Sequence, residues 1–182
     1  YPWFLDWGRD TLIAARGLVA AREFREDVKA ILLQFARFAE HGTIPNIIHG
    51  DSVGNRDTSD AQLWLFTAAE DLCKAEHSTA FLSTEVKDGK NLLDILEDIA
   101  CDLIDGTPNG IRMDAESGLI FSPAHFTWMD TNYPAGTPRE GYPIEIQALW
   151  FAALRFLSTV SATPDRWKNL AEKVRNSIGT LF

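Results

Sequence analysis

Long apolar runs and basic clusters are both missing from this chain of 182 residues. No stretch of about 18 apolar residues occurs, and no basic segment precedes a shorter apolar run, so no membrane span or signal peptide is visible. The formal net charge is −9. Because acidic residues outnumber basic ones, binding to phosphates would release few counterions, and the sequence argues against nucleic acid as a partner. A neutral, hydroxyl-rich ligand suits this composition better.

Cysteine is scarce as well. Cys73 and Cys101 are the two cysteines, each inside a helical pattern and outside any CxxC motif, and we interpret both as buried, reduced thiols. The four histidines are scattered and form no HExxH pair. The sequence therefore predicts no metal site.

Helices of two kinds alternate along the chain, whose hydrophobic content of 46% is enough for one sizeable core. Helices that are apolar on nearly all sides are predicted over residues 11–21, 61–73 and 144–157. Each is followed by a helix with a single apolar stripe, over residues 28–38, 92–103 and 167–181. A helix that is apolar all round must be buried, whereas a striped helix covers it and faces water. The alternation predicts an all-α fold, an α/α toroid with inner and outer helices.

Two long connections, residues 41–59 and 105–143, lead from striped helices into the next apolar helix. Loops this long in compact domains are usually functional. The longer one contains a predicted β-hairpin, with strands over 110–113 and 119–121 around a turn. Because successive helices run antiparallel, the inner helices all start at one end. Their polar starts should therefore converge on one mouth.

Three polar clusters mark these helix starts: residues 6–11 (DWGRDT), 57–60 (DTSD) and 139–145 (REGYPIE). The first places an aromatic ring, a guanidinium and two carboxylates within five positions. Such a set can stack on a pyranose and hydrogen-bond several hydroxyls. Trp3, Trp7 and Trp128 lie in loops near the clusters and suit stacking, and Arg9 suits holding Asp10 or sugar oxygens.

Glycosidic bond cleavage needs one carboxylic acid to protonate the leaving oxygen and a second carboxylate to activate water or attack the sugar. Five carboxylates are candidates: Asp6, Asp10, Asp60, Asp130 and Glu145. Capping of a helix is an alternative explanation for Asp6 and a stronger one for Asp60, because Thr-Ser-Asp before an apolar run is ordinary capping chemistry. For Glu145 the alternative is that it complements a helix dipole. Asp130 has no capping role, and its neighbours Trp128, Met129 and Tyr133 suit an acid that keeps its proton.

Five ordered segments resemble the C-terminal amylo-α-1,6-glucosidase domain of glycogen debranching enzymes. They are residues 2–11 (PWFLDWGRDT), 42–46 (GTIPN), 60–64 (DAQLW), 127–130 (TWMD) and 143–150 (PIEIQALW). The resemblance implies an (α/α)6 barrel related to glucoamylase that hydrolyses α-1,6 branch points of glycogen or limit dextrin with inversion. It also implies a cytoplasmic enzyme without a cofactor, because two carboxylates suffice for the chemistry.

Carried over by position, the resemblance makes Asp130 the general acid and places Trp7, Arg9 and Asp10 around the non-reducing glucose. Asp60, Arg139 and Glu145 are expected to line the same pocket, with Asp6 and Trp128 as further substrate contacts. The family's general base lies in a late segment with no counterpart here. We therefore expect residues 1–182 to form about half of a barrel, a single partial domain that packs against the missing half.

Two alternatives remain open at this point. One is another toroid glucosidase, of the glucoamylase, trehalase or processing-glucosidase type, because these families share the fold but carry different acid motifs. The other is a non-catalytic glucan-binding module, because no general base is recognised in the chain.

Overall fold

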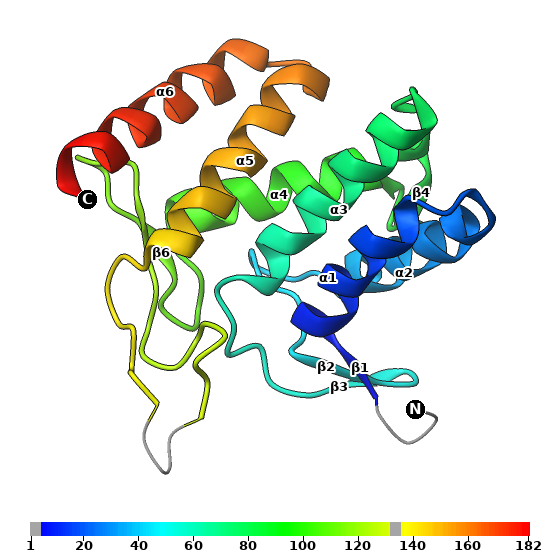
Figure 1. The fold of residues 1–182 in the computed structure, drawn as a ribbon, viewed down its shortest axis with the longest axis horizontal. Helices are drawn as coiled ribbons and strands as arrows, with labels where there is room; N and C mark the ends of the chain where they lie inside the picture. The colour runs from blue at the N-terminus through cyan, green and yellow to red at the C-terminus, as the bar shows by residue number, and fades with distance from the viewer. Residues whose placement is uncertain (1–4, 132–135) are drawn as a thin grey trace.

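The computed structural model describes residues 5–131 and 136–182, and six α-helices dominate these residues (Figure 1). They are α1 (Gly8–Val19), α2 (Arg25–Arg37), α3 (Ala61–Glu76), α4 (Leu92–Asp105), α5 (Ile144–Val160) and α6 (Pro164–Leu181). Each helix predicted from periodicity is present, although α1, α2 and α6 each begin three residues earlier than expected. No helix of the described part is long and apolar enough to cross a membrane.

Helices α1, α3 and α5 lie side by side and begin at the same end of the molecule, where the long loops gather (Figure 1). Helix α3 contacts both α1 and α5, while α2 packs on α1 and α6 packs on α5. Helix α4 contacts α2 and α5. The predicted convergence of helix starts on one side is therefore confirmed.

Only α3 fulfils the prediction of three helices buried on nearly all sides. Ile13 on α1 is 41% exposed and Ile144 on α5 is 43% exposed, so the prediction was wrong for these two helices. The reason is that α1 and α5 lie at the two ends of the row formed by α1, α3 and α5. Helix α3 has a neighbour on either flank, whereas α1 and α5 each contact a helix of the row on one flank only.

The predicted hairpin is present. Strands β6 (Arg112–Met113) and β7 (Ile120–Phe121) pair antiparallel. The structure also contains two small sheets that were not predicted. One is a three-stranded antiparallel sheet of β1 (Asp6–Trp7), β2 (Ile47–His49) and β3 (Ser52–Val53), and the other is a pair formed by β4 (Glu85–Lys87) and β5 (Lys90–Asn91). Strands of two or three residues are too short for an alternating pattern to stand out.

Buried polar side chains fasten the longest loop to α5 and to the start of α3. Gln147 of α5 donates from Nε2 to the Ile120 carbonyl (2.9 Å) and accepts from the Ile120 amide at Oε1 (2.8 Å). Trp150 Nε1 donates to the Gly118 carbonyl (3.1 Å). At the start of α3, Ser122 Oγ donates to Ser59 Oγ (2.8 Å). The loop that contains residues 127–130 is thereby held between the starts of α3 and α5.

The two cysteines differ in their surroundings. Cys73 is buried and Cys101 is half-buried, and both are free thiols. Burial raises the pKa of the Cys73 thiol to about 11, with smaller contributions from the charges of Glu76 and Glu70. The prediction of two buried thiols thus holds for Cys73 and was wrong for Cys101, whose helix position is only partly covered.

Candidate active site

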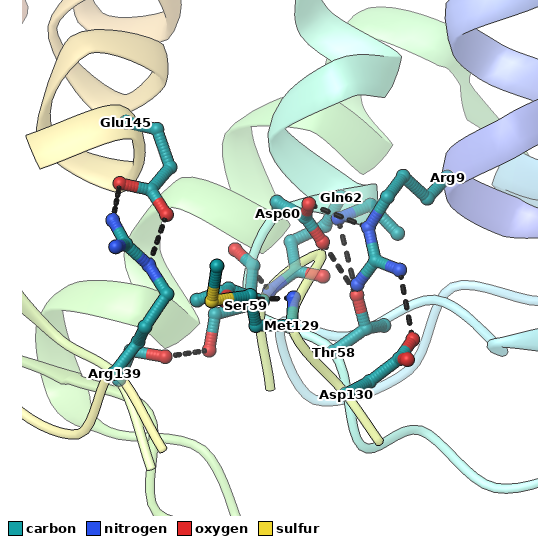
Figure 2. Close-up of polar contacts among 12 residues, drawn as sticks. Arg9, Thr58, Ser59, Asp60, Gln62, Met129, Asp130, Arg139 and Glu145 are labelled. Carbon is teal, nitrogen blue, oxygen red and sulfur yellow. Dashed lines mark hydrogen bonds and ion pairs between the residues drawn. The ribbon is translucent and has the colours of Figure 1, made fainter. Parts of the chain in front are cut away.

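Arg9 joins three segments that are far apart in sequence. It lies in the first turn of α1, and its Nε donates to Asp60 Oδ2 (2.6 Å), just before α3. Its Nη1 donates to Asp130 Oδ2 (3.0 Å), in the long loop before α5 (Figure 2). The structure thus brings together one residue from the first cluster, one from the second and the predicted acid.

Asp60 is held from two sides and is only 3% exposed. Besides the contact with Arg9, its Oδ1 accepts a hydrogen bond from the Thr58 hydroxyl (2.9 Å). The same hydroxyl accepts from the Ala61 amide (3.3 Å). Asp60 occupies the N-cap position of α3 but makes no side-chain capping bond. The capping alternative for its carboxylate was therefore wrong, because Thr58 performs that role.

Arg9 remains a cation in this setting, although its side chain is only 12% exposed. Burial lowers its pKa, but hydrogen bonds and charge interactions with Asp60 and then Asp130 outweigh this effect, so the net shift is upward. Its Nη2 is buried and has no partner within residues 5–131 and 136–182. The guanidinium is thus fixed between the two carboxylates.

Asp130 is the most accessible member of this group, with a side chain that is 42% exposed. The preceding residues form a local turn in which the Met129 amide donates to Thr127 Oγ1 (3.3 Å), and Trp128 is 57% exposed. We expected an apolar setting for the acid. Tyr133 lies outside the described residues, and the carboxylate instead meets a guanidinium and solvent. This part of the expectation was wrong.

The other residues of the first cluster lie beside Arg9. Asp6 and Trp7 form β1, paired with Ile48 and Ile47 of β2. Asp6 is therefore in a strand, and its capping alternative was wrong. Asp10 lies in the first turn of α1. All three side chains are exposed and accessible to a ligand, whereas Trp3 lies outside the described residues.

The third cluster forms a separate ion pair. Arg139 Nε donates to Glu145 Oε1 (2.8 Å), and Nη2 binds the other carboxylate oxygen. Glu145 lies in the first turn of α5, as predicted. Figure 2 shows this pair on the opposite side of Ser59 and Met129 from Arg9. The backbone of Gly141 pairs with that of Ser122, so the pair is anchored to the same loop that carries Asp130.

No group of three side chains suited to holding a metal ion occurs in the part of the chain that the structure describes. Its six helices and few short strands are consistent with an all-α glycosidase domain. The chain matches, over residues 1–182, the family model described as amylo-alpha-1,6-glucosidase, and it belongs to that family.

A curated relative is the glycogen debranching enzyme of Saccharomyces cerevisiae. The two sequences are 25% identical in an alignment 203 positions long, which covers 83% of this chain and 13% of the yeast protein. The chain thus corresponds to a small part of that relative's length.

Proposed function

We propose that this chain contributes the acid side of an active site that hydrolyses α-1,6-glucosidic branch points of glycogen or limit dextrin with inversion. Asp130 is the general acid that protonates the leaving oxygen. Membership of the amylo-alpha-1,6-glucosidase family supports the reaction class. The observation that carries the assignment is the solvent-accessible Asp130 carboxylate, held by Arg9 at the shared end of the inner helices.

The side chains around Asp130 suit a sugar. Trp128 and Trp7 present exposed rings at this end, and indole faces stack on the apolar faces of pyranoses. Asp10 and Asp6 offer carboxylate oxygens to sugar hydroxyls next to Arg9. Together with Arg139 and Glu145, and with Asp60 acting through Arg9, they make up the proposed substrate site.

The general base, in this proposal, lies outside the chain. An inverting enzyme needs a second carboxylate roughly 6.5–9.5 Å from the acid, with room for water between them. Asp60 is engaged by Arg9 and Thr58, and Glu145 is engaged by Arg139. Carboxylates engaged in this way are poor bases for a water molecule, which supports a base supplied by another segment.

We also propose that the helices form about half of an (α/α)6 toroid within one catalytic domain. Three inner helices with parallel starts and covering helices on one side support this arrangement (Figure 1). Ile13 on α1 and Ile144 on α5 are exposed apolar residues. They are suited to contact further helices of the barrel at either end of the row formed by α1, α3 and α5. The cytoplasmic location implied by the resemblance stays a prediction.

The assignment is tested in the longest parent protein that contains this chain, by replacing Asp130 with Asn. Acid catalysis typically contributes about 10²- to 10⁴-fold, so release of glucose from phosphorylase limit dextrin should fall by that factor. The matched control is Asp27→Asn, an exposed carboxylate in the first turn of α2, which should leave turnover unchanged. The first product should be β-glucose by NMR, as inversion requires.

Near-normal turnover of limit dextrin by Asp130→Asn would contradict the assignment of Asp130 as the general acid. Residues 1–182 alone are expected to release no glucose. Glucose release by a purified preparation of this segment would place the base within it, with Glu145 and Asp10 as the first candidates.

A further inference from the structure

Both carboxylate oxygens of Asp60 are engaged within the protein, and burial of the residue keeps it from direct contact with a substrate. Arg9 Nε binds one carboxylate oxygen and the Thr58 hydroxyl binds the other, and the residue is 3% exposed. Its neighbour across Arg9 is the accessible Asp130. The guanidinium is therefore shared between a buried carboxylate and an accessible one.

We propose that Asp60 is a positioning residue that balances the charge of Arg9, so that Asp130 is oriented by a guanidinium whose positive charge is already compensated. This inference rests on the proposed function, in which Asp130 is the general acid. It departs from the expectation that Asp60 contacts the sugar directly.

The physical need for such balance follows from the chemistry of a general acid. The acid must hold its proton when substrate is bound, and an uncompensated positive charge within about 4–6 Å favours loss of that proton. Arg9 also supplies a directional hydrogen bond that orients the carboxylate. Arg9 and Asp60 form an ion pair whose opposite charges balance. Arg9 can therefore orient Asp130 through a hydrogen bond without acting on it as an isolated cation.

The described surroundings of Asp130 agree with this account. From α1, Arg9 is the charged side chain in contact with it, and Asp60 from the start of α3 lies on the other side of Arg9. From its own loop, the His125 ring meets the Met129 carbonyl through Nδ1 (3.4 Å) rather than the Asp130 carboxylate. A change of charge at Asp60 or Arg9 should therefore reach Asp130 directly.

The test is the pH dependence of kcat/KM in the parent protein, measured with a branched oligosaccharide. The alkaline limb of this profile reports the acid of the free enzyme. Asp60→Asn leaves Arg9 uncompensated, so its alkaline limb should move to lower pH by about one unit. Arg9→Gln leaves Asp60 uncompensated and should move the limb to higher pH. The double variant restores neutrality, and its limb should return toward that of the wild type.

Asp71→Asn is the matched control. Arg16 Nε of α1 donates to Asp71 Oδ2 of α3 at 2.6 Å, the same distance and the same two helices as the pair of Arg9 and Asp60. Asp71 lies three turns further along α3 from the mouth. The pH profile of this variant should match that of the wild type. The control therefore separates the effect of charge balance at Arg9 from the general effect of losing an ion pair between two helices.

An alkaline limb for Asp60→Asn that coincides with that of Asp71→Asn would overturn the inference. If the single variant does not fold, the double variant decides: a limb near the wild type supports charge balance, and a limb displaced as far as in Arg9→Gln contradicts it. The proposed function fails separately, through near-normal turnover by Asp130→Asn.

Discussion

Gln147 is expected to determine whether the loop that carries Asp130 keeps its place. The change to make is Gln147→Met, which nearly conserves the size of the side chain and so creates little cavity. It removes both partners of the Ile120 backbone, whose amide and carbonyl bind Gln147 at 2.8 and 2.9 Å. Both residues are fully buried, so water cannot replace the lost hydrogen bonds without local rearrangement.

The magnitude follows from these two orphaned groups. A buried polar group without a partner costs roughly 1–3 kcal/mol, so the variant should lose about 2–6 kcal/mol of local stability. The Pro143 carbonyl also accepts from Gln147 Nε2 (3.2 Å), but it keeps the Ile146 amide as a partner (3.1 Å). We therefore count only the two groups of Ile120.

Hydrogen–deuterium exchange of the parent protein, followed by mass spectrometry, measures this loss at the peptide that contains Ile120. Each 1.4 kcal/mol corresponds to about tenfold, so exchange of the Ile120 amide should accelerate by at least about 30-fold. Gln62→Met is the control. Gln62 is equally buried, but it makes one hydrogen bond, to the Ser59 carbonyl (3.2 Å), and its Oε1 has no partner within the described ranges.

The control should change exchange at Ile120 far less, because Gln62 bonds to the Ser59 carbonyl and not to the backbone of Ile120. Equal exchange rates at Ile120 in the two variants would refute the argument that Gln147 secures the hairpin. A change confined to Gln147→Met should be accompanied by a lower kcat, because the hairpin and Asp130 belong to one loop.

Two further predictions concern the first cluster and the cysteines. Asp10→Ala should weaken binding of a glucose-like inhibitor by about 1–3 kcal/mol, because a charged hydrogen-bonding partner is lost. Calorimetry measures the affinity, with Asp27→Ala as the control. Equal affinities of the two variants would support a purely structural role for Asp10. Cys73, whose pKa is raised to about 11, should react with iodoacetamide much more slowly at pH 8 than the half-buried Cys101, because the thiolate is the nucleophile. Mass spectrometry of the labelled peptides measures the two rates. Comparable labelling of both cysteines in the folded protein would contradict the prediction.

The helices and their common start could be predicted from the sequence because they depend on local periodicity. Leu63, Leu65 and Phe66 predict a helix that is apolar on most sides, and all three side chains are fully buried in α3. The same local pattern was misleading for α1. Whether Ile13 is covered depends on which helices flank it, and that information lies in the packing of other segments.

The roles within the site were decided by tertiary structure. In the sequence, Arg9 and Asp60 stand at the starts of α1 and α3, and Asp130 lies in the loop before α5. These three helices begin at the same end of the molecule, which places the residues there. The sequence contained no local signal that one guanidinium would bind both carboxylates across 51 and 121 residues.

The physical reason is the range of the interactions. A helix is determined by contacts three or four residues apart, so its existence can be predicted from a short window of sequence. A hydrogen bond such as that from Arg9 to Asp130 depends on the crossing of α1 and α3 and on the anchoring of a long loop by Ser122 and Gln147. The residues for the site were therefore recognisable in the sequence, whereas their pairing required the packed helices.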